Sequence, residues 1–172
     1  MAKTWKDSDI SLDLIKDQTI GIIGYGIQGD AQANNLKDSG LKVIVGLKEG
    51  GSSWNKAKND GHEVMSVAEA CKKADIIHIL IPDMVQSKVY KDEIEPNLSE
   101  GKALAFSHAA AIYWGWIKAP DNVDIIMVAP KGPGSKVRET YLDGFGTPSI
   151  VAVEQDKTGR AWDRTLGIAK GI

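Results

Sequence analysis

Three glycines with the spacing G-x-G-x-x-G, at Gly24, Gly26 and Gly29, constrain the fold of this chain more than any other feature. They directly follow the apolar stretch 19–23 and directly precede a helical pattern. In such a strand–turn–helix unit the first glycine makes the tight turn, the second lets backbone approach a pyrophosphate, and the third allows close helix–strand packing. The helix N-terminus adds N–H donors and a positive dipole end. The motif therefore predicts a dinucleotide site, and the alternative is a glycine-rich turn that binds nothing.

Apolar β-type stretches alternate with helical patterns along the rest of the chain. The predicted strands are residues 19–23, 42–45, 63–65, 76–81, 103–107, 124–128 and 149–153. The predicted helices are residues 27–39, 53–60, 67–74, 85–94 and 136–142, with a last one from residue 159. This alternation is typical of βαβ units. We therefore predict an α/β fold, with a Rossmann-like, doubly wound and mostly parallel sheet in a single domain over residues 1–172.

The composition limits which partners the chain can bind and indicates its cellular compartment. The net charge is −2 over 172 residues, which argues against a nucleic-acid partner, because that partner requires a basic face. We also expect no membrane association and no signal segment, since no apolar run approaches about 18 residues. The single Cys71 excludes an internal disulfide and suits a reducing compartment, so we expect a cytoplasmic protein. No cluster of ligands has zinc spacing, and we expect no metal site in the chain.

The end of the second predicted strand favours NADP over NAD. An acidic residue there would bind the ribose 2′-hydroxyl of NAD. Here the chain continues with Lys48 and, a few residues later, Ser53, which suit a 2′-phosphate, although Glu49 weakens the signal. The alternative is a solvated turn in which Ser53 caps the next helix. The partner that we expect is thus a small molecule, NADP, in the cleft at the carboxyl ends of the strands.

A series of short motifs extends over nearly the whole chain in a recognisable order. The motifs are GYGIQG (24–29), VGLKE (45–49), SW (53–54), LIPD (80–83), YKDEIEPNL (90–98), AFSH (105–108), VAPKGPG (128–134), VR (137–138), GFGTP (144–148) and AKG (169–171). In order and spacing they resemble the N-terminal NADP-binding domain of ketol-acid reductoisomerase, also called acetohydroxy-acid isomeroreductase. That family reduces and rearranges acetohydroxy acids with NADPH and Mg²⁺.

The resemblance implies a role for particular positions. Those implied to contact or line the cofactor are Gly24, Tyr25, Gly26, Ile27, Gln28, Gly29, Lys48, Ser53, Asp83 and Pro130. His108 and Lys131 match polar residues near the family's active site. The family's acidic Mg²⁺ ligands belong to a helical domain that the resemblance does not reach. We therefore expect that this chain alone does not perform the reductoisomerase reaction.

Three positions or segments around the expected cleft depart from the family pattern. Ile27 stands where the family has a small polar residue, and Asp30 where it has a neutral or basic one. Each change is expected to cost on the order of 1 kcal/mol in cofactor affinity. The segment 109–116 reads AAAIYWGW, with alanines in place of larger or polar groups. We interpret this clustering as an engineered, rebuilt cleft with weak or lost NADP binding, the alternative being drift in a divergent homologue.

The polar groups of such a cleft would fit a second function, that of a designed hydrolase. Asp30 orienting His108 beside a serine nucleophile, Ser135 or Ser107, is an acyl-transfer arrangement typical of an esterase. The same Asp–His pair without a serine would act as a general base. Lys131 in an apolar cleft would suit Schiff-base chemistry. The remaining interpretation is a solvated rim without catalysis.

Overall fold

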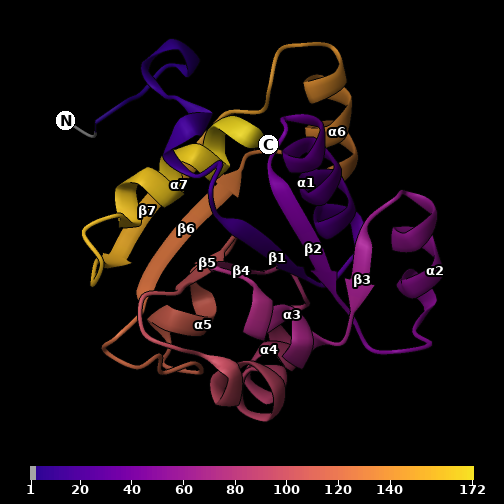
Figure 1. The fold of residues 1–172 in the computed structure, drawn as a ribbon. Coiled ribbons are helices and arrows are strands. Elements are labelled where there is room, and N and C mark those ends of the chain that lie inside the picture. The colour runs from indigo at the N-terminus through magenta and orange to yellow at the C-terminus, as the bar shows by residue number, and fades with distance from the viewer. Residues whose placement is uncertain (1–2) are drawn as a thin grey trace.

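A seven-stranded sheet in the order β3-β2-β1-β4-β5-β6-β7 forms the centre of the computed structural model, which describes residues 3–172 (Figure 1). The strands are β1 (Thr19–Ile23), β2 (Lys42–Gly46), β3 (Glu63–Met65), β4 (Ile76–Ile79), β5 (Ala103–Phe106), β6 (Asp124–Pro130) and β7 (Ser149–Gln155). Neighbouring strands from β3 to β6 are parallel, whereas β7 is antiparallel to β6. The strand order reverses between β1 and β4, which is where ligands bind in such sheets.

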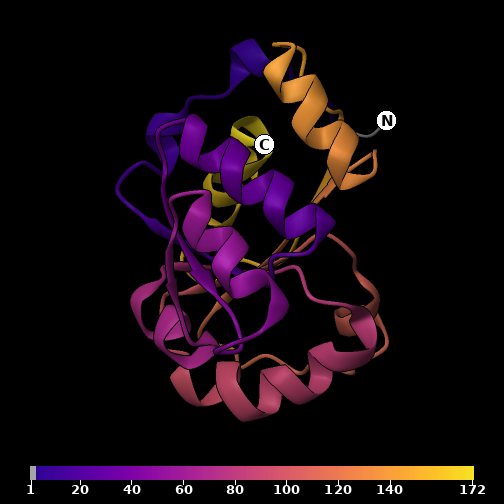
Figure 2. The same ribbon diagram turned by 90° about the vertical axis from the view of Figure 1, so that its right-hand side faces the viewer.

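Helices cover both faces of the sheet. Figures 1 and 2 show α1, α6 and α7 on one face and α3, α4 and α5 on the other, with α2 beside the edge strand β3. The helices are α1 (Ile27–Asp38), α2 (Ser52–Asn59), α3 (Val67–Lys73), α4 (Asp83–Val89), α5 (Ala110–Tyr113), α6 (Gly134–Leu142) and α7 (Ala161–Gly171). The short helical turns are η1 (Asp7–Asp9), η2 (Leu12–Leu14), η3 (Tyr90–Ile94) and η4 (Glu95–Asn97).

Strand β4 shows why the sheet is buried on both sides. Its alternate residues face opposite layers: Ile76 joins the apolar cluster under α1 and α7, and Ile77 and Ile79 join the cluster over α3 and α5. All four of its residues are buried, as in a central parallel strand. The third, His78, is a fully buried histidine in the core, as its place in the strand suggests.

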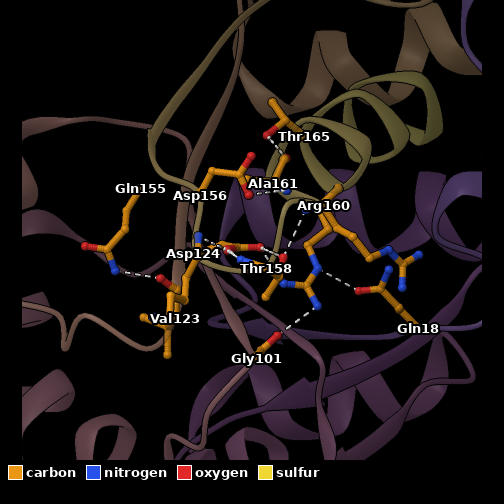
Figure 3. A network of polar contacts seen from close by, with 12 residues as sticks. Gln18, Gly101, Val123, Asp124, Gln155, Asp156, Thr158, Arg160, Ala161 and Thr165 are labelled. Carbon is orange, nitrogen blue, oxygen red and sulfur yellow. Dashed lines mark hydrogen bonds and ion pairs between the residues drawn. The ribbon is translucent and has the colours of Figure 1, made fainter.

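A buried ion pair anchors α7 to the amino end of β6. The carboxylate of Asp124 lies 2.6 Å from the guanidinium of Arg164, and both side chains are almost completely buried. Thr158 and the backbone of Lys157 donate further hydrogen bonds to Asp124, as Figure 3 shows for part of this network. Burial would raise the pKa of Asp124, but the bonds from Thr158 and Arg164 outweigh it and lower this pKa. The ion pair and its hydrogen bonds therefore have a structural role at this end of the sheet.

The predicted fold is confirmed, and nearly all element ends agree with the prediction to within two residues. The sequence pattern did not predict α5, which begins within the alanine run after His108. Strand β6 extends two residues beyond the prediction because β7 pairs with it as far as Pro130, opposite Ser149. The helix predicted at 85–94 begins at Asp83 and continues as the wider turn η3.

Candidate functional site

The glycine turn has the geometry that its spacing predicts. Gly24 has a positive φ of 98°, and a Cβ there would lie 2.6 Å from the side chain of Ile81. A Cβ on Gly29 would lie 2.2 Å from the carbonyl oxygen of Gly24, so α1 can pack here only without a side chain. Gly26 differs, because a Cβ there would meet no atom of the chain within 4 Å. The backbone at Gly26, next to the helix N-terminus, is therefore open to a ligand.

Two other residues of the motif have side chains engaged within the protein. Tyr25 is buried, and its hydroxyl donates a hydrogen bond of 2.8 Å to Asp60. Gln28 donates a bond of 2.9 Å to the carbonyl of Gly132, which joins α1 to the loop before α6. Ile27 is 72% exposed at the mouth of the turn. Of these three side chains, that of Ile27 is the exposed one.

The loop between β2 and α2 presents a cation and hydroxyls near this turn. Lys48 is exposed, and its carbonyl accepts a hydrogen bond of 3.0 Å from the amide of Gly51 in a tight turn. Ser53 lies in the first turn of α2 and is partly exposed. The strand itself ends at Gly46, so no carboxylate occupies the position that would select NAD.

The other side of the cleft joins β4, β5 and β6. The Nδ1 atom of His108, after β5, lies 3.2 Å from a carboxylate oxygen of Asp83, at the start of α4. Gln86 donates a hydrogen bond of 3.0 Å to the other oxygen of Asp83. His108 and Lys131 both line a cavity of about 340 Å³, together with Tyr113 and Trp114 among others. The structure thus brings Asp83, His108 and Lys131 to one region, and Pro130 ends the strand beside them.

The pairing of Asp30 with His108 is wrong. One oxygen of Asp30 lies 2.8 Å from the Nζ of Lys56, and the other accepts a hydrogen bond of 2.8 Å from Asn34. This carboxylate is therefore directed to α2 and already neutralised, while the carboxylate beside His108 is that of Asp83. The sequence could not reveal this, because Asp30 and Lys56 are far apart along the chain and belong to different helices.

Neither serine is placed as a nucleophile for His108. Ser107 donates a hydrogen bond of 2.8 Å to the carbonyl of Val128, and its hydroxyl lies 3.3 Å from the Nε2 of His78. Ser135 is exposed in the first turn of α6, after the loop that carries Lys131, and does not line the cavity that holds His108. The histidine next to a serine is thus the buried His78.

A buried polar chain under the cleft is a feature that sequence reasoning missed. Gln32, on α1, donates hydrogen bonds to Gln28 (3.0 Å) and to Ser107 (3.2 Å). His78 approaches the same hydroxyl from β4. The chain of contacts connects the glycine turn to the ends of β4 and β5. No local signal marks it, since each residue alone is typical of a helix or a core strand.

Within residues 3–172, no group of three or more His, Cys, Asp or Glu side chains is placed to hold a metal ion. In that same range no helix is both long and apolar enough to cross a bilayer.

Sequence comparisons relate the chain to one family. The family model described as "Acetohydroxy acid isomeroreductase, NADPH-binding domain" matches residues 14–172. The ketol-acid reductoisomerase (NADP(+)) of Nitrosopumilus maritimus (strain SCM1) is 82% identical over 172 residues, which are 100% of this chain and 52% of that protein. The enzyme of the same name from Methanocaldococcus jannaschii is 60% identical over the same shares. The chain thus spans about half the length of these relatives.

A structural comparison agrees. The chain is similar to an NADH-preferring ketol-acid reductoisomerase from an uncultured archaeon, with a TM-score of 0.93 and 48% identity over 96% of this chain and 51% of that one. Pyrroline carboxylate reductase from Plasmodium falciparum, at 17% identity and a TM-score of 0.67 over 91% of this chain and 56% of that one, shares the fold alone. These matches give no support to an engineered cleft or to a hydrolase.

Proposed function

Because the chain belongs to the acetohydroxy acid isomeroreductase family, we propose that it binds NADP(H) across the glycine turn and the β2–α2 loop. The observation that carries the proposal is the contrast at the turn: Gly24 and Gly29 are closed by the protein itself, whereas Gly26 faces open space at a helix N-terminus. A pyrophosphate needs this combination of close backbone approach and N–H donors. Bound NADPH would supply a hydride to a substrate.

Recognition of the 2′-phosphate is assigned to Lys48 and Ser53. Lys48 supplies an exposed ammonium group and Ser53 a hydroxyl, and both belong to the connection that follows β2. The related archaeal enzyme described as NADH-preferring makes this assignment worth testing, since the same fold accommodates either preference. Lys48 favours the phosphorylated cofactor in this chain.

The affinity for NADPH is proposed to be reduced by one residue of the turn. Ile27 places an exposed apolar side chain where the diphosphate would lie. Asp30, by contrast, has its charge paired with Lys56 and contributes less repulsion than its position in the first turn of α1 suggests. The expected reduction therefore depends mainly on Ile27, and Ile27→Ser is expected to tighten NADPH binding.

The activity of the longer relatives is a further part of the proposal. As the cofactor half of a ketol-acid reductoisomerase, the chain would present His108 and Lys131 to an acetohydroxy acid, with Asp83 orienting the imidazole. The Mg²⁺ of that reaction needs oxygen ligands from elsewhere in the relatives. We therefore propose that these 172 residues bind NADP(H) but do not by themselves oxidise NADPH in the presence of acetohydroxy acid and Mg²⁺. We also propose that the protein is cytoplasmic.

Calorimetric titration with NADPH and NADH tests this function. We expect one NADPH per chain, with an affinity several-fold higher than that for NADH. Lys48→Gln combined with Ser53→Ala is expected to weaken NADPH binding about tenfold and to leave NADH binding nearly unchanged. Lys72→Gln, which removes an exposed charge from α3, is the matched control. Absence of saturable binding of either cofactor would refute the proposal, and tighter NADH binding would refute the assignment of Lys48 and Ser53.

A further inference from the structure

We propose that Lys56 is a positioning residue for the 2′-phosphate loop, through ion pairs that tie α2 to the glycine turn. The inference rests on the proposed NADP function and goes beyond it. On this inference, discrimination between NADPH and NADH depends on a lysine that forms ion pairs with two carboxylates of the chain and does not contact the cofactor.

The geometry of Lys56 is that of a bridge. Its Nζ atom lies 2.8 Å from Asp30, in the first turn of α1, and 2.8 Å from Asp60, just after α2. The same ammonium group lies 5.1 Å from the ring centroid of Tyr25, inside the glycine turn. Asp60 also accepts the hydroxyl hydrogen bond of Tyr25. One lysine therefore connects α2 to two residues of the turn region.

Asp30 is held in place to receive this lysine. Asn34, one turn further along α1, donates hydrogen bonds to Asp30 (2.8 Å) and to the hydroxyl of Tyr25 (3.0 Å). Its amide oxygen lies 3.1 Å from the Nε2 of His62. The second oxygen of Asp30 is left for Lys56. The carboxylate is thus oriented toward α2 by a network of neighbours.

Helix α2 needs such a tether because little apolar packing holds it. Of its eight residues, only Ala57 is fully buried, and Trp54 is partly buried against the core. The chain after the helix is fixed separately, since Lys37 donates hydrogen bonds to the carbonyls of Asp60 and Gly61. The ion pair of Lys56 with Asp30 connects the helix itself to α1. Ser53 lies three residues before Lys56, on the same side of the helix, and therefore depends on this bridge for its position relative to the turn.

Two accounts of the same residues predict opposite results. If Asp30 acted mainly as a negative charge near the diphosphate, Asp30→Asn would tighten NADPH and NADH alike. If Asp30 acts through Lys56, the same substitution frees α2 and weakens NADPH, while NADH, which has no 2′-phosphate, loses little. The ratio of the two dissociation constants separates the accounts, because a general loss of stability would not change one cofactor alone.

The experiment measures dissociation constants of NADPH and NADH for the 172-residue chain and four variants, with a thermal melt of each. We expect Asp30→Asn and Lys56→Met to weaken NADPH about tenfold and NADH less than twofold. Lys56→Arg is expected to retain the wild-type ratio within about threefold. The control is Lys73→Met, which breaks an exposed ion pair of the same length, 2.8 Å to Glu63, on α3.

The outcomes distinguish this inference from the proposed function. A wild-type chain that binds neither cofactor overturns both. A wild-type chain that binds NADPH, with an unchanged NADPH-to-NADH ratio in Asp30→Asn and Lys56→Met, overturns the role of Lys56 alone, as does tighter NADPH binding by Asp30→Asn. If Lys56→Met melts before it can be measured, Asp30→Asn and Lys56→Arg decide the question.

Discussion

The Nε2 atom of His78 lies 3.3 Å from the Oγ atom of Ser107 inside the sheet, and the other ring nitrogen has no hydrogen-bond partner within residues 3–172. Burial lowers the pKa of His78 from 6.5 to about 4. In the unfolded chain the imidazole therefore binds a proton at a higher pH than in the folded one. The free energy of unfolding is expected to fall as the pH decreases from 6.5 to 4, by roughly 3 kcal/mol.

Urea denaturation at several pH values between 7 and 4 measures this effect. The variant His78→Gln keeps a donor near Ser107 but cannot titrate. The slope of its free energy of unfolding against pH is therefore expected to be smaller than that of the wild type by the contribution of about one proton. Identical slopes in the wild type and in His78→Gln would show that His78 is not the group responsible.

The buried pair of Asp124 and Arg164 supports stability rather than binding. Arg164→Met would leave a buried carboxylate without its cation, and we expect a loss of about 3–5 kcal/mol in the free energy of unfolding. Arg160→Met removes a more exposed ion pair, 3.7 Å from Asp17, and is expected to cost less than about 1 kcal/mol. Chemical denaturation compares the two, and equal losses would contradict the role assigned to burial.

The glycine turn allows binding and stability to be separated. Gly26 has φ −80° and free space around it, so Gly26→Ala is expected to leave the melting temperature nearly unchanged while weakening NADPH at least tenfold. Gly29→Ala is expected to destabilise the fold itself, because its Cβ would collide with the backbone of Gly24. Differential scanning fluorimetry with and without NADPH reports both effects. NADPH affinity unaffected by Gly26→Ala would place the diphosphate elsewhere.

Ester hydrolysis tests the alternative function, that of a hydrolase, which the structure makes less plausible. Since Asp30 is bonded to Lys56 and Asn34, His108 has no serine–histidine–aspartate arrangement through Asp30. An activated aryl ester is expected to be cleaved no faster by the chain than by free imidazole at equal concentration. A burst of product that disappears in His108→Ala would restore the hydrolase interpretation.

The local patterns of the sequence were sufficient for the fold and for the turn. Gly24 and Gly29 have the conformation and the close contacts that the spacing predicts, and β4 is buried on both faces as its apolar run indicates. The direction of β7 could not be read, because a strand that pairs antiparallel at the sheet edge has the same composition as a parallel one. Periodicity therefore determined which elements form but not every pairing.

Local sequence patterns could not predict which polar side chains of the site contact one another. The sequence pairs His108 with Asp30 rather than with Asp83, because Asp30 and His108 both follow strands at the same edge of the sheet. Residue spacing cannot say which way a carboxylate points. The contact with Lys56 depends on how α2 packs beside α1. The approach of His78 to Ser107 depends on the register between β4 and β5, which places His78 beside Ala105. Such contacts between elements need the three-dimensional structure.

Amide chemical-shift mapping of the ¹⁵N-labelled chain during titration with NADPH tests the central claim most directly. The account predicts that the amides of the glycine turn, residues 24–30, and those of the β2–α2 loop, residues 47–53, shift together along one saturating curve. NADH should shift the glycine turn but move the loop less. Shifts confined to the cavity lined by Tyr113 and Trp114, or none that saturate at the glycine turn, would contradict the account.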